Sequence, residues 1–166
     1  MSNTAKERMD RAQAILDEYE QKSGLPNVGE SPCTEDELNE YLSMCRNDIE
    51  ALSPSICDGI IVRLSQSSIY IRRLINKEKS RFTWANNEIL RYICDKVDSV
   101  GGQYSKYDVK VSLLAKEDNY ISSLLYIKNH SQERVDRLFN LSEDLNSLRF
   151  AFLEVKKTKI FERKTE

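Results

Sequence analysis

A cluster of cations in the middle of the chain is the segment whose residue types point most directly to a chemistry. Five lysine and arginine residues fall within ten positions, and a tryptophan and two further cations follow them. The set is Arg72, Arg73, Lys77, Lys79, Arg81, Trp84, Arg91 and Lys110. On a helix, Arg73, Lys77 and Arg81 share one face, because they are spaced four residues apart. Cations along a helix face can neutralise phosphates, and an aromatic ring beside them can stack on a base.

These residues are therefore our candidate nucleic-acid-binding site. The alternative interpretation is an ordinary solvated helix face with Trp84 as a core or interface anchor, a role that suits Trp84 as well as base stacking does.

No set of residues has the spacing of a catalytic or metal centre. The only histidine, His130, has no sequence context that marks it as a catalytic base. The cysteines form no C-x-x-C pair, so a zinc site is not expected; they are Cys33, Cys45, Cys57 and Cys94. Cys45 and Cys57 follow apolar neighbours and are expected to be small core residues. The sequence predicts a protein that is not an enzyme, with no catalytic residues, no metal and no cofactor.

The candidate cations lie within one predicted long helix, over about residues 54–98. Its inner positions alternate in steps of three and four: Ile61, Leu64, Ser68, Ile71, Ile75, Glu78, Phe82, Ala85, Ile89 and Tyr92. This pattern is a heptad seam, on which only Ser68 and Glu78 are polar. Ser53 and Pro54 suit the N-cap and the first helical position. A helix of about 45 residues would be roughly 65 Å long, which is typical of a scaffold or an interface.

A second long helix is predicted over about residues 105–161, after a turn at Gly101 and Gly102. We expect a kink or short break at Asn129-His130-Ser131. The second half carries a further heptad, formed by Leu138, Leu141, Leu145, Leu148, Phe152 and Val155. Two helices alone cannot cover each other's apolar faces, so this surplus seam predicts a homo-oligomer through a helical bundle.

The N-terminal part is predicted to contain shorter helices. Residues 1–33 form an acidic amphipathic arm and linker, in which residues 3–22 place five apolar side chains on one face: Met9, Ala12, Ile15, Leu16 and Tyr19. Thr34 and Glu37 have the spacing of a capping box that starts the next helix. Residues 34–166 are expected to form a single helical domain. The predicted class is all-α: a long antiparallel helical hairpin with short N-terminal helices, in a coiled-coil-like oligomeric bundle.

Charge is distributed unevenly along the chain. Residues 1–53 hold 12 acidic and 5 basic residues, residues 54–100 hold 5 and 8, and residues 101–166 hold 10 and 12. The near-neutral total therefore combines an acidic first third with a basic remainder. This asymmetry suggests an acidic partner for the basic part or self-association between unlike halves, although solvated helix faces would also produce it. No long apolar segment suits a membrane span or a signal peptide, so we expect a cytoplasmic protein that does not bind membranes.

Residues 106–118, which read KYDVKVSLLAKED, open a helix that leads into Leu124–Ile127 and later into Arg149–Phe152. This pattern resembles the UvsY-type recombination mediators of T-even-like phages over about residues 70–155. The resemblance implies an all-helical homo-oligomer that binds single-stranded DNA in the host cytoplasm. It also implies two protein partners, a RecA-like recombinase and a single-strand-binding protein. In that family the C-terminal helix forms the oligomer, which here corresponds to Leu138–Val155.

Two hypotheses about function follow. The first is a non-catalytic accessory protein of recombination or replication that binds single-stranded DNA and loads a recombinase. The alternative is a coiled-coil protein-interaction or structural module without nucleic-acid binding, such as a phage adaptor, virion component or inhibitor. The two differ in whether the cations around Arg73 and the ring of Trp84 face solvent together.

Overall fold

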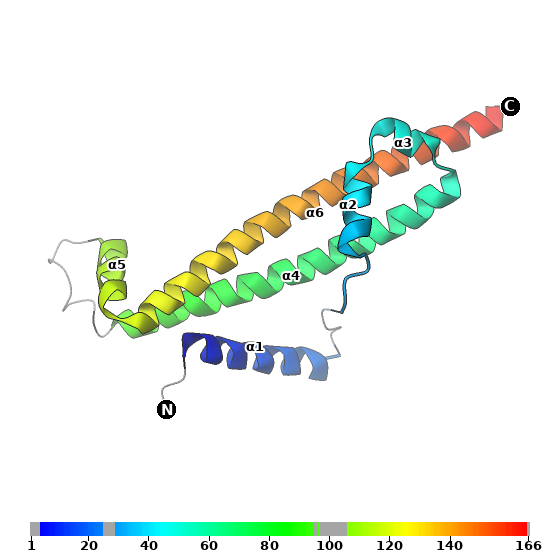
Figure 1. Cartoon of the computed structure of the whole chain (residues 1–166). Helices are drawn as coiled ribbons and strands as arrows, with labels where there is room; N and C mark the ends of the chain where they lie inside the picture. The colour runs from blue at the N-terminus through cyan, green and yellow to red at the C-terminus, as the bar shows by residue number, and fades with distance from the viewer. Residues whose placement is uncertain (1–3, 25–28, 95, 97–105, 166) are drawn as a thin grey trace. The chain divides into compact units, whose positions relative to one another are not determined.

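The computed structural model describes residues 4–24, 29–94, 96 and 106–165. These residues form six α-helices and no strand, so the predicted all-α class is confirmed (Figure 1). The helices are α1 (Ala5–Lys22), α2 (Glu35–Ser43), α3 (Arg46–Ala51), α4 (Pro54–Cys94), α5 (Tyr107–Glu117) and α6 (Asn119–Thr165). The predicted turn at Gly101 and Gly102 lies outside the described residues.

The chain divides into two compact units, and the division crosses both long helices. Unit 1 contains Met1–Asn27 and Asn76–Asp136, and unit 2 contains Val28–Ile75 and Arg137–Glu166. This division differs from the expected arm over residues 1–33 followed by a single domain over residues 34–166. The reason is that α4 and α6 each contribute one part to each unit, while α1 belongs to unit 1.

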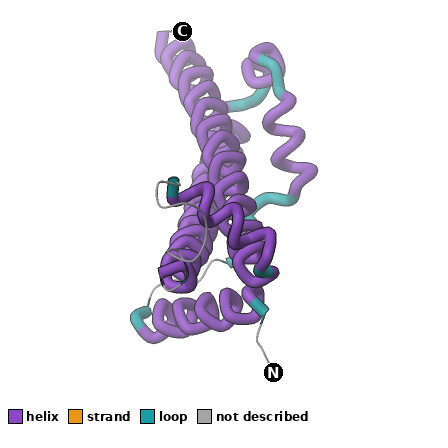
Figure 2. Tube along the Cα trace, turned by 90° about the vertical axis from the view of Figure 1, so that its left-hand side faces the viewer, coloured by secondary structure: helices purple, strands orange, loops and turns teal. Residues whose placement is uncertain are grey.

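Helices α4 and α6 run antiparallel within each unit, as the sequence predicted: their colours progress in opposite directions in Figure 1, and Figure 2 shows the long helices side by side. Three pairs between the two helices establish the direction: Glu78–Arg134 in unit 1, and Asp58–Lys156 and Ser68–Ser142 in unit 2. In unit 1, Tyr92 of α4 also contacts Asp118, the residue directly before α6. In both units, a higher residue number on α4 meets a lower number on α6. The hairpin is therefore present in the described parts of both helices.

The predicted heptad seam is the inner face of α4. Each of its ten residues is buried or half-buried. The two polar positions are buried as well, and both meet polar residues of α6. Ser68 Oγ lies 3.5 Å from Ser142 Oγ, and Glu78 pairs with Arg134. The seam was predictable because its period is a local property of the sequence. Its polar partners on α6 were not predictable, because they come from a distant part of the chain.

Unit 1 has a core to which four helices contribute. Its buried residues are Ala5, Ile89, Ile93, Val111, Leu114, Ile121 and Leu124. Helix α1 joins this core through Ala5, directly after the capping box that Thr4 and Glu7 form. The predicted apolar face of α1 is only partly used, because Met9 and Ala12 are half-buried while Ile15, Leu16 and Tyr19 are exposed.

The break in the second half of the chain lies at Asp118, and the prediction of a kink at Asn129-His130-Ser131 is wrong. Helix α6 continues through residues 129–131, while Asp118 adopts an extended backbone between α5 and α6. Its carboxylate accepts hydrogen bonds from the Tyr120 N–H at 2.8 Å and the Tyr92 hydroxyl at 2.7 Å. Aspartate favours helix N-termini because its side chain can accept such backbone hydrogen bonds. The hydrogen bond from Tyr92 is the main cause that lowers the pKa of Asp118.

Unit 2 contains the short helices α2 and α3. Thr34 and Glu37 form the predicted capping box at the start of α2. Cys57 is buried as expected, but Cys45 is exposed immediately before α3, so its assignment to the core is wrong. The physical reason is that the chain leaves the helical conformation at Met44 and Cys45, which removes Cys45 from the apolar face of α2.

Candidate functional site

The predicted cation cluster is divided between the two units. Arg72 and Arg73 belong to unit 2, where Arg72 is exposed and Arg73 is half-buried. The other members belong to unit 1, where Lys79 and Arg91 are exposed and Lys110 of α5 is half-buried. The structure therefore does not describe the eight residues as one site.

Three of the predicted cations in unit 1 pair with carboxylates of the same chain. The pairs are Lys77–Asp17 at 3.8 Å, Arg81–Glu78 at 3.2 Å and Arg91–Glu88 at 3.1 Å. The first of these joins α4 to α1, so the acidic N-terminal helix lies against part of the predicted face. Glu78 is buried, whereas the side chains of Lys77, Asp17 and Arg91 are all partly or fully exposed. Ion pairs near the surface contribute little, about 0–1 kcal/mol, so a phosphate can compete for Lys77 and Arg91.

Trp84 is half-buried and packs against the core of unit 1. Its ring contributes to holding that core together. Arg73, by contrast, belongs to unit 2. Trp84 and Arg73 therefore belong to different units, and neither unit by itself combines the tryptophan ring with Arg73 in one exposed patch.

A groove of about 640 Å³ in unit 1 gathers a different set of polar side chains. The start of α1, the middle of α4 and the first half of α6 form its walls. The charged and aromatic residues that line it are Lys6, Glu78, Arg81, Tyr126, His130 and Arg134. Only Arg81 among them belongs to the predicted site.

Glu78 determines the charge balance of this groove. The residue is 5% exposed, and its Oε1 lies 3.2 Å from both Arg81 Nη1 and Arg134 Nε. A buried carboxylate requires such partners, because its desolvation is costly. One carboxylate therefore balances two guanidinium groups, and Lys6 adds a third cation. The groove carries an excess of two positive charges.

Tyr126 supplies an aromatic ring at the same groove. It is 69% exposed, and its ring makes an edge-on contact with His130 at a centroid distance of 5.7 Å. An accessible ring beside several cations is an arrangement that can stack a base while the cations contact phosphates. Tyr126, rather than Trp84, has the exposure that this role requires.

The groove residues that the sequence analysis missed are Lys6, Tyr126, His130 and Arg134. They come from two helices whose contributing segments lie more than one hundred positions apart in the sequence. No local motif joins them. His130 was predicted to lie near a helix break, whereas it is exposed within the uninterrupted first half of α6.

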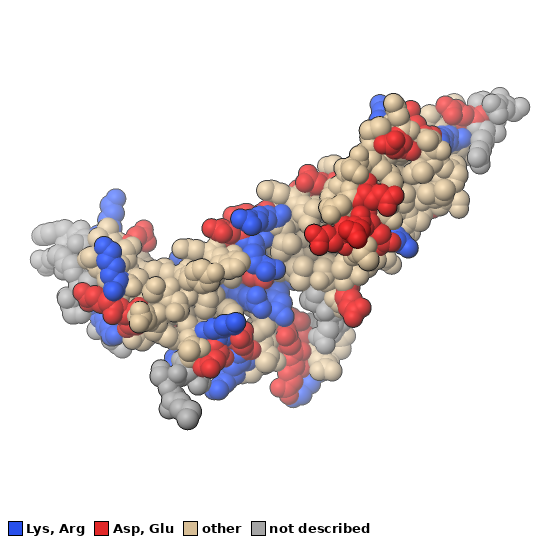
Figure 3. All heavy atoms as spheres, viewed as in Figure 1, with Lys and Arg blue, Asp and Glu red and all other residues tan. Residues whose placement is uncertain are grey.

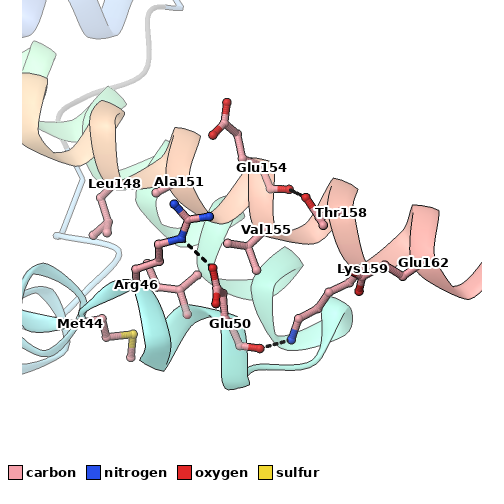
Figure 4. A pocket seen from close by; sticks show the side chains of 11 residues that line it. Met44, Arg46, Glu50, Leu148, Ala151, Glu154, Val155, Thr158, Lys159 and Glu162 are labelled. Carbon is pink, nitrogen blue, oxygen red and sulfur yellow. Dashed lines mark hydrogen bonds and ion pairs between the residues drawn. The ribbon is translucent and has the colours of Figure 1, made fainter.

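The predicted oligomer seam on α6 is partly used within the chain. Leu145 and Phe152 are 0% exposed, and the remaining members are half-buried: Leu138, Leu141, Leu148 and Val155. Leu148 and Val155 line a second groove, in unit 2, opposite Met44 of the α2–α3 connection (Figure 4). Lys159 also lines this groove, and its Nζ donates to the Leu52 carbonyl at 2.6 Å. An oligomer formed through this seam stays a prediction.

Acidic and basic side chains are interspersed on the visible face of the molecule. Figure 3 shows lysine and arginine beside aspartate and glutamate on α1, and acidic side chains gathered over α2. Lysine and arginine side chains also gather over the middle of α4, so on this face charges of one sign form local groups among the described residues.

No protein-family model, curated protein or solved structure gives a significant match to this chain. Within the described ranges, no helix combines the length and apolar character that crossing a lipid bilayer demands.

Proposed function

We propose that the protein is a non-catalytic accessory of recombination or replication that binds single-stranded DNA and acts as a homo-oligomer. The observation that supports this proposal is the groove in unit 1, where Arg81 and Arg134 pair with one carboxylate and Lys6 lines the same groove, beside the exposed ring of Tyr126. The resemblance to UvsY-type mediators suggests its partners, a RecA-like recombinase and a single-strand-binding protein.

The groove suits a single strand better than a duplex. A single strand can turn a base toward Tyr126 while neighbouring phosphates contact the cations, whereas bases in a duplex are already stacked on one another. One groove of this size can bind only a few nucleotides. Several copies in an oligomer would raise the affinity, because each bound groove increases the effective concentration of the strand at the next.

The test is fluorescence anisotropy of a labelled single-stranded oligonucleotide with the wild-type protein and two tyrosine variants. Tyr126→Ala removes the ring at the groove, and Tyr19→Ala removes a ring of similar exposure, 67%, from α1 outside it. Loss of a base-stacking ring costs about 1–3 kcal/mol, so Tyr126→Ala should weaken binding roughly 5- to 150-fold. Tyr19→Ala should leave binding unchanged. Equal affinities for all three proteins would contradict the assignment of the groove.

The second candidate function is a helical protein-interaction or structural module without nucleic-acid binding. It is favoured by the carboxylate partners of Lys77, Arg81 and Arg91, which reduce the positive charge of the predicted face. Absence of DNA binding by the wild-type protein, even at low salt, would support this candidate over the first.

A further inference from the structure

Three phenylalanines stand on one exposed line of α6, within unit 2. Phe139, Phe150 and Phe161 are 55%, 58% and 70% exposed. They are spaced eleven residues apart, which is about three turns of an α-helix at about 3.6 residues per turn, so they share one face. Three of the five phenylalanines in the chain are thus placed on a single solvent-facing line. Neighbouring rings are about 16 Å apart along the helix at about 1.5 Å per residue, a regular spacing that a partner helix of the same period can match.

The residues between the phenylalanines complete a continuous stripe. Its members are Phe139, Glu143, Asn146, Phe150, Glu154, Lys157 and Phe161, separated by steps of 4, 3, 4, 4, 3 and 4 residues. Asn146 is half-buried, and the other six are exposed. This stripe is distinct from the predicted seam, whose residues Leu145 and Phe152 are fully buried within the chain.

The spacing of this stripe is symmetric about Phe150. We infer that the stripe binds the same stripe of a second copy of this chain, antiparallel, with Phe150 at the two-fold axis. In that register Phe150 meets Phe150 of the other copy, and Phe139 meets Phe161. A two-fold interface requires a surface that complements itself in this way.

The charges along the stripe fit the same register. Glu143 and Lys157 lie seven residues before and after Phe150, so each glutamate meets a lysine of the other copy. Glu154 meets Asn146, whose amide can donate to the carboxylate. A parallel pair would instead place Glu143 against Glu143 and Lys157 against Lys157. Like charges in contact oppose that arrangement, so the antiparallel register is selected.

The apolar area is sufficient for a weak, specific dimer. A phenylalanine presents roughly 200 Å² when fully exposed, so six rings at these exposed fractions offer about 700 Å² in total. The polar residues between them bring the interface toward about 1,000 Å², the lower end for specific association. The eleven-residue spacing also keeps two nearly straight helices in contact over the full stripe. The Arg149 guanidinium, 5.1 Å from the centroid of the Phe150 ring, leaves that side chain 58% exposed.

Sedimentation velocity of the full chain across the micromolar range tests the pairing. The wild-type protein should shift from monomer to dimer as its concentration rises. Phe150→Asp places two carboxylates at the axis and should raise the dissociation constant about tenfold or more. The control is Ile69→Asp on α4, where the replaced side chain is 51% exposed and lies outside the stripe; its dimerisation should match the wild type.

A charge exchange tests the register. Glu143→Lys and Lys157→Glu should each weaken the dimer, because each sets like charges against each other at two places. The double variant restores unlike pairs and should regain most of the affinity. In a parallel dimer the exchange would restore nothing. Circular dichroism should show unchanged helix content for every variant, since the replaced side chains are exposed.

A chain that stays monomeric at all concentrations would overturn the inference, as would a dimer that Phe150→Asp leaves intact. Failure of the double exchange to recover affinity would overturn the antiparallel register. The inference does not rest on DNA binding, because its readout is the mass of the protein. A chain that stays monomeric would also contradict the homo-oligomer of the proposed function, but it would leave the DNA-binding groove in unit 1 untouched. Loss of DNA binding alone would leave the dimer untouched.

Discussion

The Nε of Arg134 lies 3.2 Å from the Oε1 of Glu78, which joins α6 to α4 inside unit 1. The same oxygen pairs with Arg81. This pairing explains why a glutamate occupies a mostly apolar helix seam, since two guanidinium groups compensate the desolvation of its carboxylate. It also sets the excess positive charge of the groove that we propose for single-stranded DNA.

Replacing Glu78 should change stability and DNA binding in opposite directions. Glu78→Gln removes the negative charge between Arg81 and Arg134, so the free energy of unfolding should fall by about 1–3 kcal/mol. The groove's excess of two positive charges becomes three, and binding of single-stranded DNA should tighten severalfold. Urea denaturation and anisotropy measure the two effects.

The matched control for Glu78→Gln is Glu88→Gln, which removes the partner of Arg91 outside the groove. It should change DNA binding much less. If Glu78→Gln weakened DNA binding in a folded protein, the charge balance described for the groove would be contradicted.

Reversing the charge of one lysine at a time should show whether DNA binds at the groove or at the cation face predicted on α4. Lys6→Glu changes the charge of the groove by two, whereas Lys79→Glu makes the same change at an exposed position that does not line it. Only Lys6→Glu should weaken binding strongly, and it should reduce the slope of log affinity against log salt by about 0.7 for each phosphate that the variant no longer neutralises. Salt titrations of DNA binding by both variants measure these changes. If Lys79→Glu weakened DNA binding more than Lys6→Glu, the cation face predicted on α4 would be favoured over the groove.

The junction at Asp118 should make part of the stability depend on pH. The Tyr92 hydroxyl is the main group that lowers the pKa of Asp118, so the native state favours the ionised carboxylate. Its stabilising effect is present above the unfolded pKa of about 4 and is lost as pH falls through the lower native value. Asp118→Asn should reduce the free energy of unfolding at neutral pH by about 1 kcal/mol, with the difference disappearing near pH 2. Urea denaturation at several pH values would show it; a difference that persists in acid would contradict this explanation.

A buried hydroxyl in unit 2 should be dispensable. Ser67 is 1% exposed, and its Oγ makes no hydrogen bond to any residue in the described part of the chain. Ser67→Ala removes this unsatisfied group and improves helix propensity, so it should raise the free energy of unfolding by about 1 kcal/mol. The neighbouring Ser68→Ala should not stabilise, because it takes away the partner of Ser142. Thermal or urea denaturation of both variants measures these changes in stability. A lower stability of Ser67→Ala would contradict the claim that the Ser67 hydroxyl is dispensable.

The sequence predicted those features that depend on local periodicity. The seam from Ile61 to Tyr92 and the capping box at Thr34 are of this kind, because helix geometry alone determines which residues share a face. The break at Asp118 was missed although it has a local signal, since an aspartate can cap the helix that follows it through a backbone N–H, here that of Tyr120. Its second contact, with the Tyr92 hydroxyl of α4, depends on tertiary packing and has no local signal.

The groove was missed for a related reason: Lys6 and Arg134 approach each other only when α1 and α6 pack in unit 1. The seam on α6 illustrates a third difficulty. Its period was read correctly, but a repeat does not reveal which helix covers it, and Leu145 and Phe152 are buried within the chain.

The most direct test of the proposed function is the anisotropy of a labelled single-stranded oligonucleotide titrated with the wild-type protein at several salt concentrations, with a duplex of the same sequence as comparison. We predict saturable binding that prefers the single strand and weakens steadily as salt rises, since neutralised phosphates release their counterions. Absence of binding at the lowest salt, or equal affinity for the duplex, would contradict the proposed function.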